Sequence, residues 1–174
     1  MKLASFVTAF AVLTFVGLFA APAPLETVVA QSSDAGFDIA LDHVALSVPD
    51  IGQSVAWYQE MFGFKEVRHT AEPNGMQTAL LQRGDIKIEL FQVPGAAPLP
   101  ESRRDPSEDF RTNGVKHFAF RVKDVRAALA QLQAKGVKVV FELRDYPGAA
   151  FAFVSDNAGN AVELIQYKTN EPVR

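Results

Sequence analysis

An internal repeat constrains the fold of this 174-residue chain more than any other feature. Residues 41–64 and 115–137 share one pattern: a histidine opens an alternating apolar stretch, an aspartate follows, and an amphipathic segment then ends at a glycine. Alternation with period two predicts a β-strand, and Asp50 and Asp124 are favourable N-caps for the helices that should follow. Each copy therefore begins with a strand and a helix.

Three further apolar runs separated by turn residues follow in each copy. They cover 65–70, 77–82 and 86–92 in the first copy, and 138–144, 150–155 and 161–167 in the second. The sequence thus predicts an α+β fold of two βαβββ modules, 38–93 and 114–168, within one domain over 38–168. Because one module leaves a face of its sheet uncovered, we expect that face to be buried against the other copy or a second chain.

The segment 94–113 joins the modules and is rich in proline and charge. It has two interpretations. It is either a solvated surface loop or a mobile flap over a site, in which case Arg103 or Arg104 could meet an anionic substrate.

Residues 1–30 are typical of a secretory signal peptide. Lys2 precedes a long apolar run, and we expect cleavage to leave a mature chain that begins near Gln31. The run is nearly as long as the ~20 residues that span a bilayer, so an uncleaved anchor is the alternative. The domain is predicted to be exported, periplasmic or secreted, with no membrane contact unless this segment is retained.

Composition limits the function to small-molecule chemistry. The formal net charge of −3 offers no basic field for nucleic acid. The absence of cysteine excludes disulfides, iron–sulfur clusters and thiol nucleophiles. A metal ion could be held only by His, Asp or Glu.

Two histidines and two glutamates repeat in register. Glu89 follows His43 by 46 positions, and Glu163 follows His117 by the same 46. If the first and last strands of each module are neighbours, all four side chains point into one hollow. Two neutral imidazoles and two carboxylates balance one divalent cation (Ni, Zn, Co, Mn or Fe) and leave positions open for water or substrate.

These modules and their four residues, with the closing stretch 156–163, resemble the vicinal oxygen chelate superfamily, which includes glyoxalase I, methylmalonyl-CoA epimerase, extradiol dioxygenases and bleomycin resistance proteins. The resemblance implies curved mixed sheets around a metal site and a homodimer. The His/Glu/His/Glu set is most similar to that of glyoxalase I. It implies a lyase or isomerase in which Glu163 or Glu89 abstracts a proton next to a carbonyl while the metal stabilises an enediolate. Asn157 replaces a proline common in the family's closing turn, and we expect the turn to be kept.

Other members of the superfamily suggest alternatives. Methylmalonyl-CoA epimerase performs the same kind of step but commonly has Gln at the position of Glu89. An iron(II) extradiol dioxygenase uses two His and one Glu, and a bleomycin resistance protein binds its ligand without metal. Arg121, on the face of His117, is the candidate anion contact, and His69 is expected to be exposed. Six aromatic residues could line a pocket, although most are expected in the core: Phe91, Phe118, Phe120, Tyr146, Phe151 and Phe153.

Overall fold

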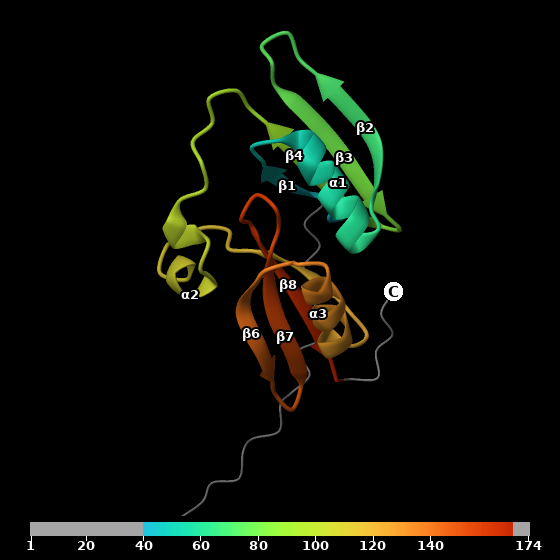
Figure 1. Ribbon diagram of the computed structural model, residues 1–174, viewed down its shortest axis with the longest axis vertical. Coiled ribbons are helices and arrows are strands. Elements are labelled where there is room, and N and C mark those ends of the chain that lie inside the picture. The colour runs from blue at the N-terminus through green and yellow to red at the C-terminus, as the bar shows by residue number, and fades with distance from the viewer. Residues whose placement is uncertain (1–39, 169–174) are drawn as a thin grey trace, which may run out of the picture. The chain divides into compact units, whose positions relative to one another are not determined.

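The computed structural model describes residues 40–168 of the chain (Figure 1). The predicted signal segment, its cleavage point and the first residues of the predicted domain lie outside the described residues. Within 40–168, no helix is long and apolar enough to span a bilayer.

The two predicted βαβββ modules are confirmed. The first contains β1 (Val44–Ser47), α1 (Ile51–Phe62), β2 (Lys65–Ala71), β3 (Gln77–Arg83) and β4 (Ile86–Gln92). The second contains β5 (Phe118–Arg121), α3 (Val125–Ala134), β6 (Val139–Asp145), β7 (Ala149–Ser155) and β8 (Ala161–Tyr167). The segment between them is more structured than a simple loop, because it forms a 3-10 turn, η1 (Glu101–Arg103), and a short helix, α2 (Pro106–Asp109).

Each module forms a four-stranded mixed sheet, and the described part of the chain closes no barrel. The strand orders are β1-β4-β3-β2 and β5-β8-β7-β6. The first and last strands of each module are parallel neighbours, and the remaining pairs are antiparallel. The expected adjacency of the histidine strand and the glutamate strand is therefore present in both modules.

The caps predicted from the repeat start both helices. The Asp50 side chain accepts a hydrogen bond from the Gln53 backbone N–H at 2.9 Å, and Asp124 accepts one from Ala127 at 3.0 Å. The first helix ends at Gly63, whose φ of 68° lies in the left-handed region that glycine tolerates. The caps fix where each histidine strand gives way to its helix.

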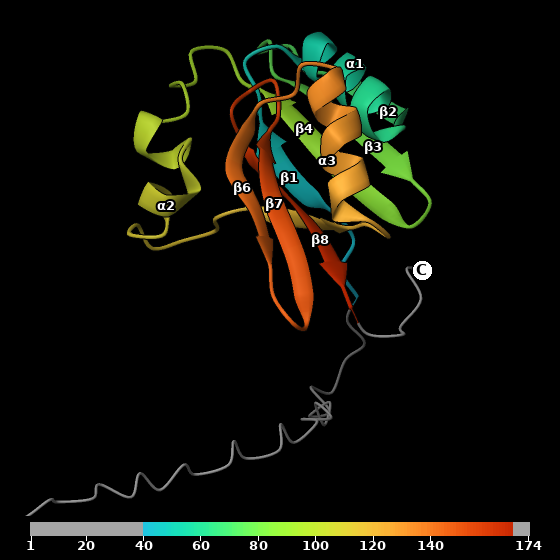
Figure 2. The same ribbon diagram turned by 60° about the horizontal axis from the view of Figure 1, so that its bottom comes forward.

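Helices α1 and α3 each pack on one face of the sheet of their own module, as Figures 1 and 2 show. Ile51, Val55 and Tyr58 of α1 and Val125 and Leu129 of α3 are buried in the core. In β4 and β8 alternate residues are buried toward the helices, so the other set faces away from them. Both glutamates belong to that second set, which leaves them free to form a site.

A buried polar link joins the modules. The Tyr58 hydroxyl donates to Asp156 Oδ2 at 2.9 Å, and both residues are buried. Asn157, which replaces the common proline, donates from Nδ2 to Ser54 Oγ at 3.1 Å. The closing turn is kept, and it holds the second module against helix α1 of the first.

Candidate metal site

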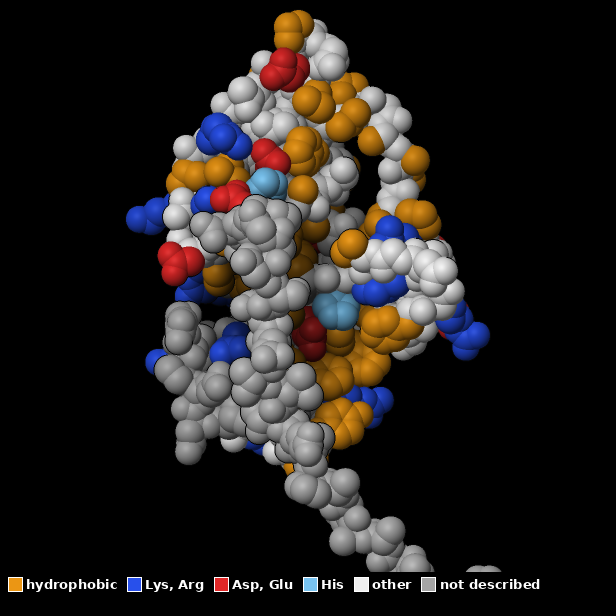
Figure 3. Space-filling model, turned by 180° about the vertical axis from the view of Figure 1, so that it is seen from behind, with side chains coloured by type: hydrophobic (Ala, Val, Ile, Leu, Met, Phe, Trp, Pro, Cys, Tyr) orange, Lys and Arg blue, Asp and Glu red, His pale blue; other side chains and the backbone are white. Residues whose placement is uncertain are grey.

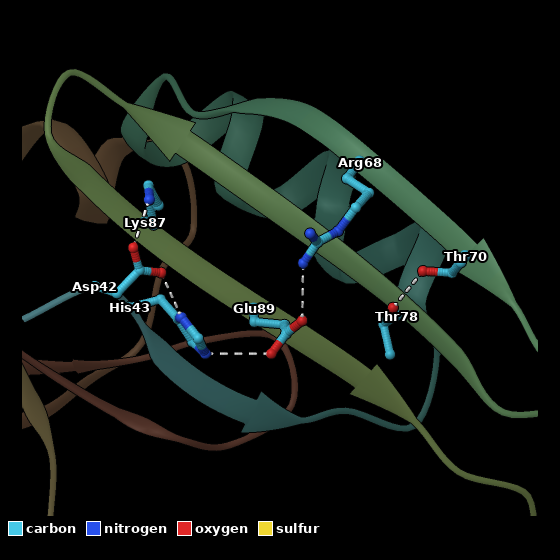
Figure 4. A network of polar contacts seen from close by, with 7 residues as sticks. All are labelled: Asp42, His43, Arg68, Thr70, Thr78, Lys87 and Glu89. Atoms are coloured by element: carbon cyan, nitrogen blue, oxygen red, sulfur yellow. Dashed lines mark hydrogen bonds and ion pairs between the residues drawn. The ribbon is translucent and has the colours of Figure 1, made fainter.

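The first His/Glu pair lies at the start of β1 and the middle of β4. His43 immediately precedes β1, and Ala45 is the register partner of Glu89. His43 Nε2 lies 3.3 Å from Glu89 Oε2, while Nδ1 lies 2.8 Å from Asp42 Oδ1 (Figure 4). A proton on Nδ1, donated to Asp42, leaves the Nε2 lone pair directed toward Glu89. This is the tautomer that a metal-binding histidine needs.

Cations surround the first pair. Lys87 Nζ donates to Asp42 Oδ2 at 2.7 Å, and Arg68 lies 3.4 Å from Glu89 Oε1. Hydrogen bonds from Lys87 and His43 lower the pKa of Asp42 to about 2. Asp42 is therefore ionised at neutral pH and can accept the hydrogen bond from His43 Nδ1.

The second pair has the same contact between a histidine and a glutamate, but its neighbouring residues differ. His117 immediately precedes β5, and its Nε2 lies 3.0 Å from Glu163 Oε2. Lys116 stands where Asp42 stands in the first module, and it donates instead to the buried Asp109. The His117 ring packs edge-on against Phe153, with 4.7 Å between centroids. One histidine is thus oriented by a carboxylate and the other by an aromatic ring.

The structure brings the four predicted ligands together as two pairs and not as one group. Among residues 40–168, no cluster of three or more His, Asp or Glu side chains could hold a metal ion. Figure 3 shows two separate histidine patches on one face, each next to acidic side chains. Each pair supplies one imidazole nitrogen and one carboxylate oxygen, which suit a divalent first-row metal. The nitrogen and oxygen atoms of these residues therefore fit such a metal. A site with four ligands requires both pairs to bind the same ion.

The arginines predicted to meet an anion differ in their partners. The guanidinium of Arg121 lies over the Tyr167 ring, 4.8 Å from its centroid. Arg103 donates to Asp109 Oδ1 and to the Val115 carbonyl, and Arg104 donates to the Leu99 carbonyl. Arg103 still lines a cavity of about 650 Å³ that His117 also borders. Its guanidinium is already engaged, whereas that of Arg121 makes only an aromatic contact among the described residues.

The predicted aromatic set divides between the two sides of the second sheet. Phe118 and Phe120 lie on the helix side, and Phe120 packs on Phe62 at 4.9 Å between centroids. Phe151 and Phe153 lie on the side of Glu163, since Phe153 is the register partner of that glutamate. Phe153 is buried, as expected of a core ring, whereas Phe151 is half-buried on the face that carries Glu163.

A sequence model described as "Glyoxalase/Bleomycin resistance protein/Dioxygenase superfamily" matches residues 40–164. The chain belongs to this superfamily. The Escherichia coli protein YaeR is 31% identical to this superfamily member over 71% of this chain and 93% of its own length. Human mitochondrial methylmalonyl-CoA epimerase is 28% identical over 73% of this chain and 77% of its own length.

A solved structure shows the same superfamily fold. The glyoxalase family protein from Enterococcus faecalis superimposes with a TM-score of 0.61, covering 72% of this chain and 96% of its own. Its sequence identity to this chain is 24%, so the likeness concerns the fold alone.

Sequence reasoning missed three polar neighbours of the first pair: Asp42, Arg68 and Lys87. Asp42 had a usable signal, because it directly precedes His43 whereas a lysine directly precedes His117. Arg68 had none. The register of β2 shifts between Glu66 and Arg68, so counting alternate residues does not place Arg68 beside Glu89. His69, as expected, is exposed, and its Nδ1 lies 2.6 Å from Glu66.

Proposed function

We propose that this superfamily member is a divalent-metal-dependent lyase or isomerase of the glyoxalase I type, which removes a proton next to a carbonyl of a small molecule. The observation that carries the proposal is the duplicated pair: in both modules an imidazole Nε2 lies within 3.3 Å of a glutamate Oε2. Superfamily membership and the epimerase relative support the same class of reaction.

The four paired residues are the proposed metal ligands: His43, Glu89, His117 and Glu163. A bound divalent ion would polarise the substrate carbonyl and offset the negative charge that develops when the neighbouring proton leaves. The chain's own part is to orient the two imidazoles, with Asp42 accepting the Nδ1 proton of His43, and to accept the proton that leaves the substrate.

Glu163 is the proposed proton acceptor. Among residues 40–168 its Oε1 has no hydrogen-bond partner, whereas Oε1 of Glu89 lies 3.4 Å from Arg68. A carboxylate already shared with a guanidinium is a poorer acceptor than one with a free oxygen. Glu89 therefore serves as a ligand and Glu163 also as the general base.

A homodimer would complete the site. The first pair of one chain and the second pair of another would together supply two imidazoles and two carboxylates, which the described part of one chain does not gather. Export is a separate proposal that rests on residues 1–30, and N-terminal sequencing of the protein recovered from outside the cytoplasm tests it.

Elemental analysis tests the metal assignment. We expect one divalent ion per chain in the wild type and its loss in H43A, E89A, H117A and E163A. H69A is the matched control, because His69 also contacts a glutamate yet belongs to neither pair. Failure of the reconstituted wild type to bind metal would instead favour a binding protein.

Solvent deuterium exchange at the carbon next to the carbonyl tests the reaction. The hemithioacetal that methylglyoxal forms with a thiol such as glutathione should exchange the hydrogen next to its carbonyl in the wild type and not in E163Q. The epimerase relative makes methylmalonyl-CoA the second substrate to try. Oxygen uptake with catechols and no exchange would assign the chain to the dioxygenases.

A further inference from the structure

Two rows of side chains cross the face of the second sheet that carries Glu163. Strand register places Ala119, Glu163, Phe153 and Phe141 in one row. The next row contains Arg121, Ile165, Phe151 and Arg144. Two residues along a strand separate the rows, a distance of about 7 Å. A small molecule can therefore contact both rows at once.

The rings in these rows form a continuous aromatic surface. Phe141 and Phe151 stack with centroids 6.1 Å apart, and Tyr146 stacks on Phe151 at 6.0 Å. Phe153 lies edge-on to Phe141 at 5.5 Å and touches the His117 ring. Figure 3 shows hydrophobic side chains gathered beside one of the histidine patches. The surface therefore runs directly up to the His117/Glu163 pair.

An arginine stands at each end of the second row. The Arg144 guanidinium lies 5.4 Å from the centroid of the Phe141 ring, and that of Arg121 lies over Tyr167. Within residues 40–168 neither arginine pairs with a carboxylate, whereas Arg126 is paired with Asp145. Two guanidinium groups with unused donors thus flank an apolar centre, which suits an anion that also has an aromatic part.

The first sheet has no such surface. The residues equivalent to Phe153 and Phe141 are Leu80 and Arg68, which are the register partners that follow Glu89. Thr78 and Thr70 follow in the next row and bond to each other at 2.8 Å. The aromatic surface is therefore a property of the second module and not of the repeated fold.

We propose that this surface binds the substrate as an aromatic or planar apolar anion. Its ring lies on Phe151 and Phe141, and its carboxylate or similar group meets Arg144 or Arg121. The carbon that loses the proton then lies at Glu163, one row away. The inference rests on the proposed function for the role of Glu163 and names the substrate class of that site.

Binding of 3-phenylpropionate to the metal-free full chain tests the surface without the reaction. We expect isothermal titration to show weaker binding of 3-phenylpropanol, which has the ring without the charge, by roughly tenfold. F151L should weaken 3-phenylpropionate about threefold to tenfold, since a lost aromatic contact is worth that much. In R121Q/R144Q the acid and the alcohol should bind equally.

Matched controls separate the surface from the fold. F118L removes a ring on the helix side of the same sheet, and R83Q removes an exposed arginine of the first sheet. Both should bind like the wild type, and unfolding midpoints show whether each variant is folded. E163Q should retain binding while losing proton exchange, so a failure of the proposed reaction is distinguishable from a failure of the surface.

Two results would overturn the inference. The first is that the wild type binds 3-phenylpropionate and 3-phenylpropanol with equal affinity, or binds neither. The second is that the wild type is a dimer that does not bind 3-phenylpropionate and that F141A converts it to a monomer. This face would then be a contact between subunits.

Discussion

Arg68 and Phe141 occupy equivalent positions in the two sheets, each being the register partner of the residue that lies across from a glutamate. Arg68 reaches back to Glu89 at 3.4 Å, whereas Phe141 stacks with other rings near Glu163. The same position of the repeat thus holds a cation that reaches Glu89 and an aromatic ring that packs on other rings, two strands away from Glu163.

Replacing this cation should strengthen metal binding. In R68M a positive charge near the proposed metal is lost, and at low ionic strength such a repulsion is worth about 1 kcal/mol in water. We expect the dissociation constant for zinc, measured by competition with a chelator, to fall about threefold to tenfold, and less at high salt. R83M is the control for loss of charge elsewhere on the sheet. Weaker binding in R68M would show that Arg68 chiefly orients Glu89.

Mixing inactive variants should restore metal sites if two chains build each site. H43A and H117A damage different pairs, so a mixed dimer has one intact site and one doubly damaged site. Refolding the two together should recover about a quarter of the wild-type metal content, since about half of the dimers are mixed. Recovery of none would mean that both pairs of a site come from one chain.

The link between the modules should contribute measurably to stability. Y58F removes the hydroxyl that donates to Asp156, and loss of a buried hydrogen bond to a charged group costs about 1–3 kcal/mol. Burial, together with the charge of Asp156, raises the pKa of Tyr58 well above 10.0, so the hydroxyl remains a donor. Urea unfolding should show this loss in Y58F and none in Y146F, whose ring is 55% exposed. Equal losses in both variants would contradict the assignment.

His69 should give the chain a small stability that depends on pH. Hydrogen bonds to Glu66, above all, and to Gln77 raise the pKa of His69 above its ordinary 6.5. The folded chain therefore holds this proton more tightly than the unfolded chain. The stabilisation is complete below 6.5 and is lost as the pH rises through the raised value.

NMR titration of the histidines measures this shift. We expect the midpoint of His69 to lie above 6.5 and to fall in E66Q. The stability advantage of the wild type over H69Q should be larger in mild acid than in mild base. A midpoint at or below 6.5 would refute the assigned contact.

The elements and both His/Glu pairs were predictable because they depend on short-range patterns. Alternation, caps and turn residues define each strand and helix, and a parallel first and last strand bring His43 to Glu89 and His117 to Glu163. The same repeat says nothing about whether the two pairs meet, because that depends on how whole modules or chains are placed.

The surroundings of the pairs were less predictable, because irregular strands break the alternation. The register of β6 shifts between Phe141 and Arg144, as that of β2 does near Arg68. Phe151 and Phe153 lie within the apolar run 149–154, which reads as a strand buried on both faces. Only the register of β7 with β8 shows that both rings lie on the same face of the sheet as Glu163.

The unlike neighbours of the two glutamates have a stereochemical consequence. A carbon that has lost its proton next to a carbonyl is flat, and its two faces differ only in what surrounds them. A base on one side of that carbon returns the proton to that side. Because Arg68 holds Glu89 while Glu163 keeps an oxygen without a partner among residues 40–168, we expect the proton to return from the side of Glu163 and the product to be a single enantiomer. A racemic product would mean that Glu89 also carries the proton, as an epimerisation requires.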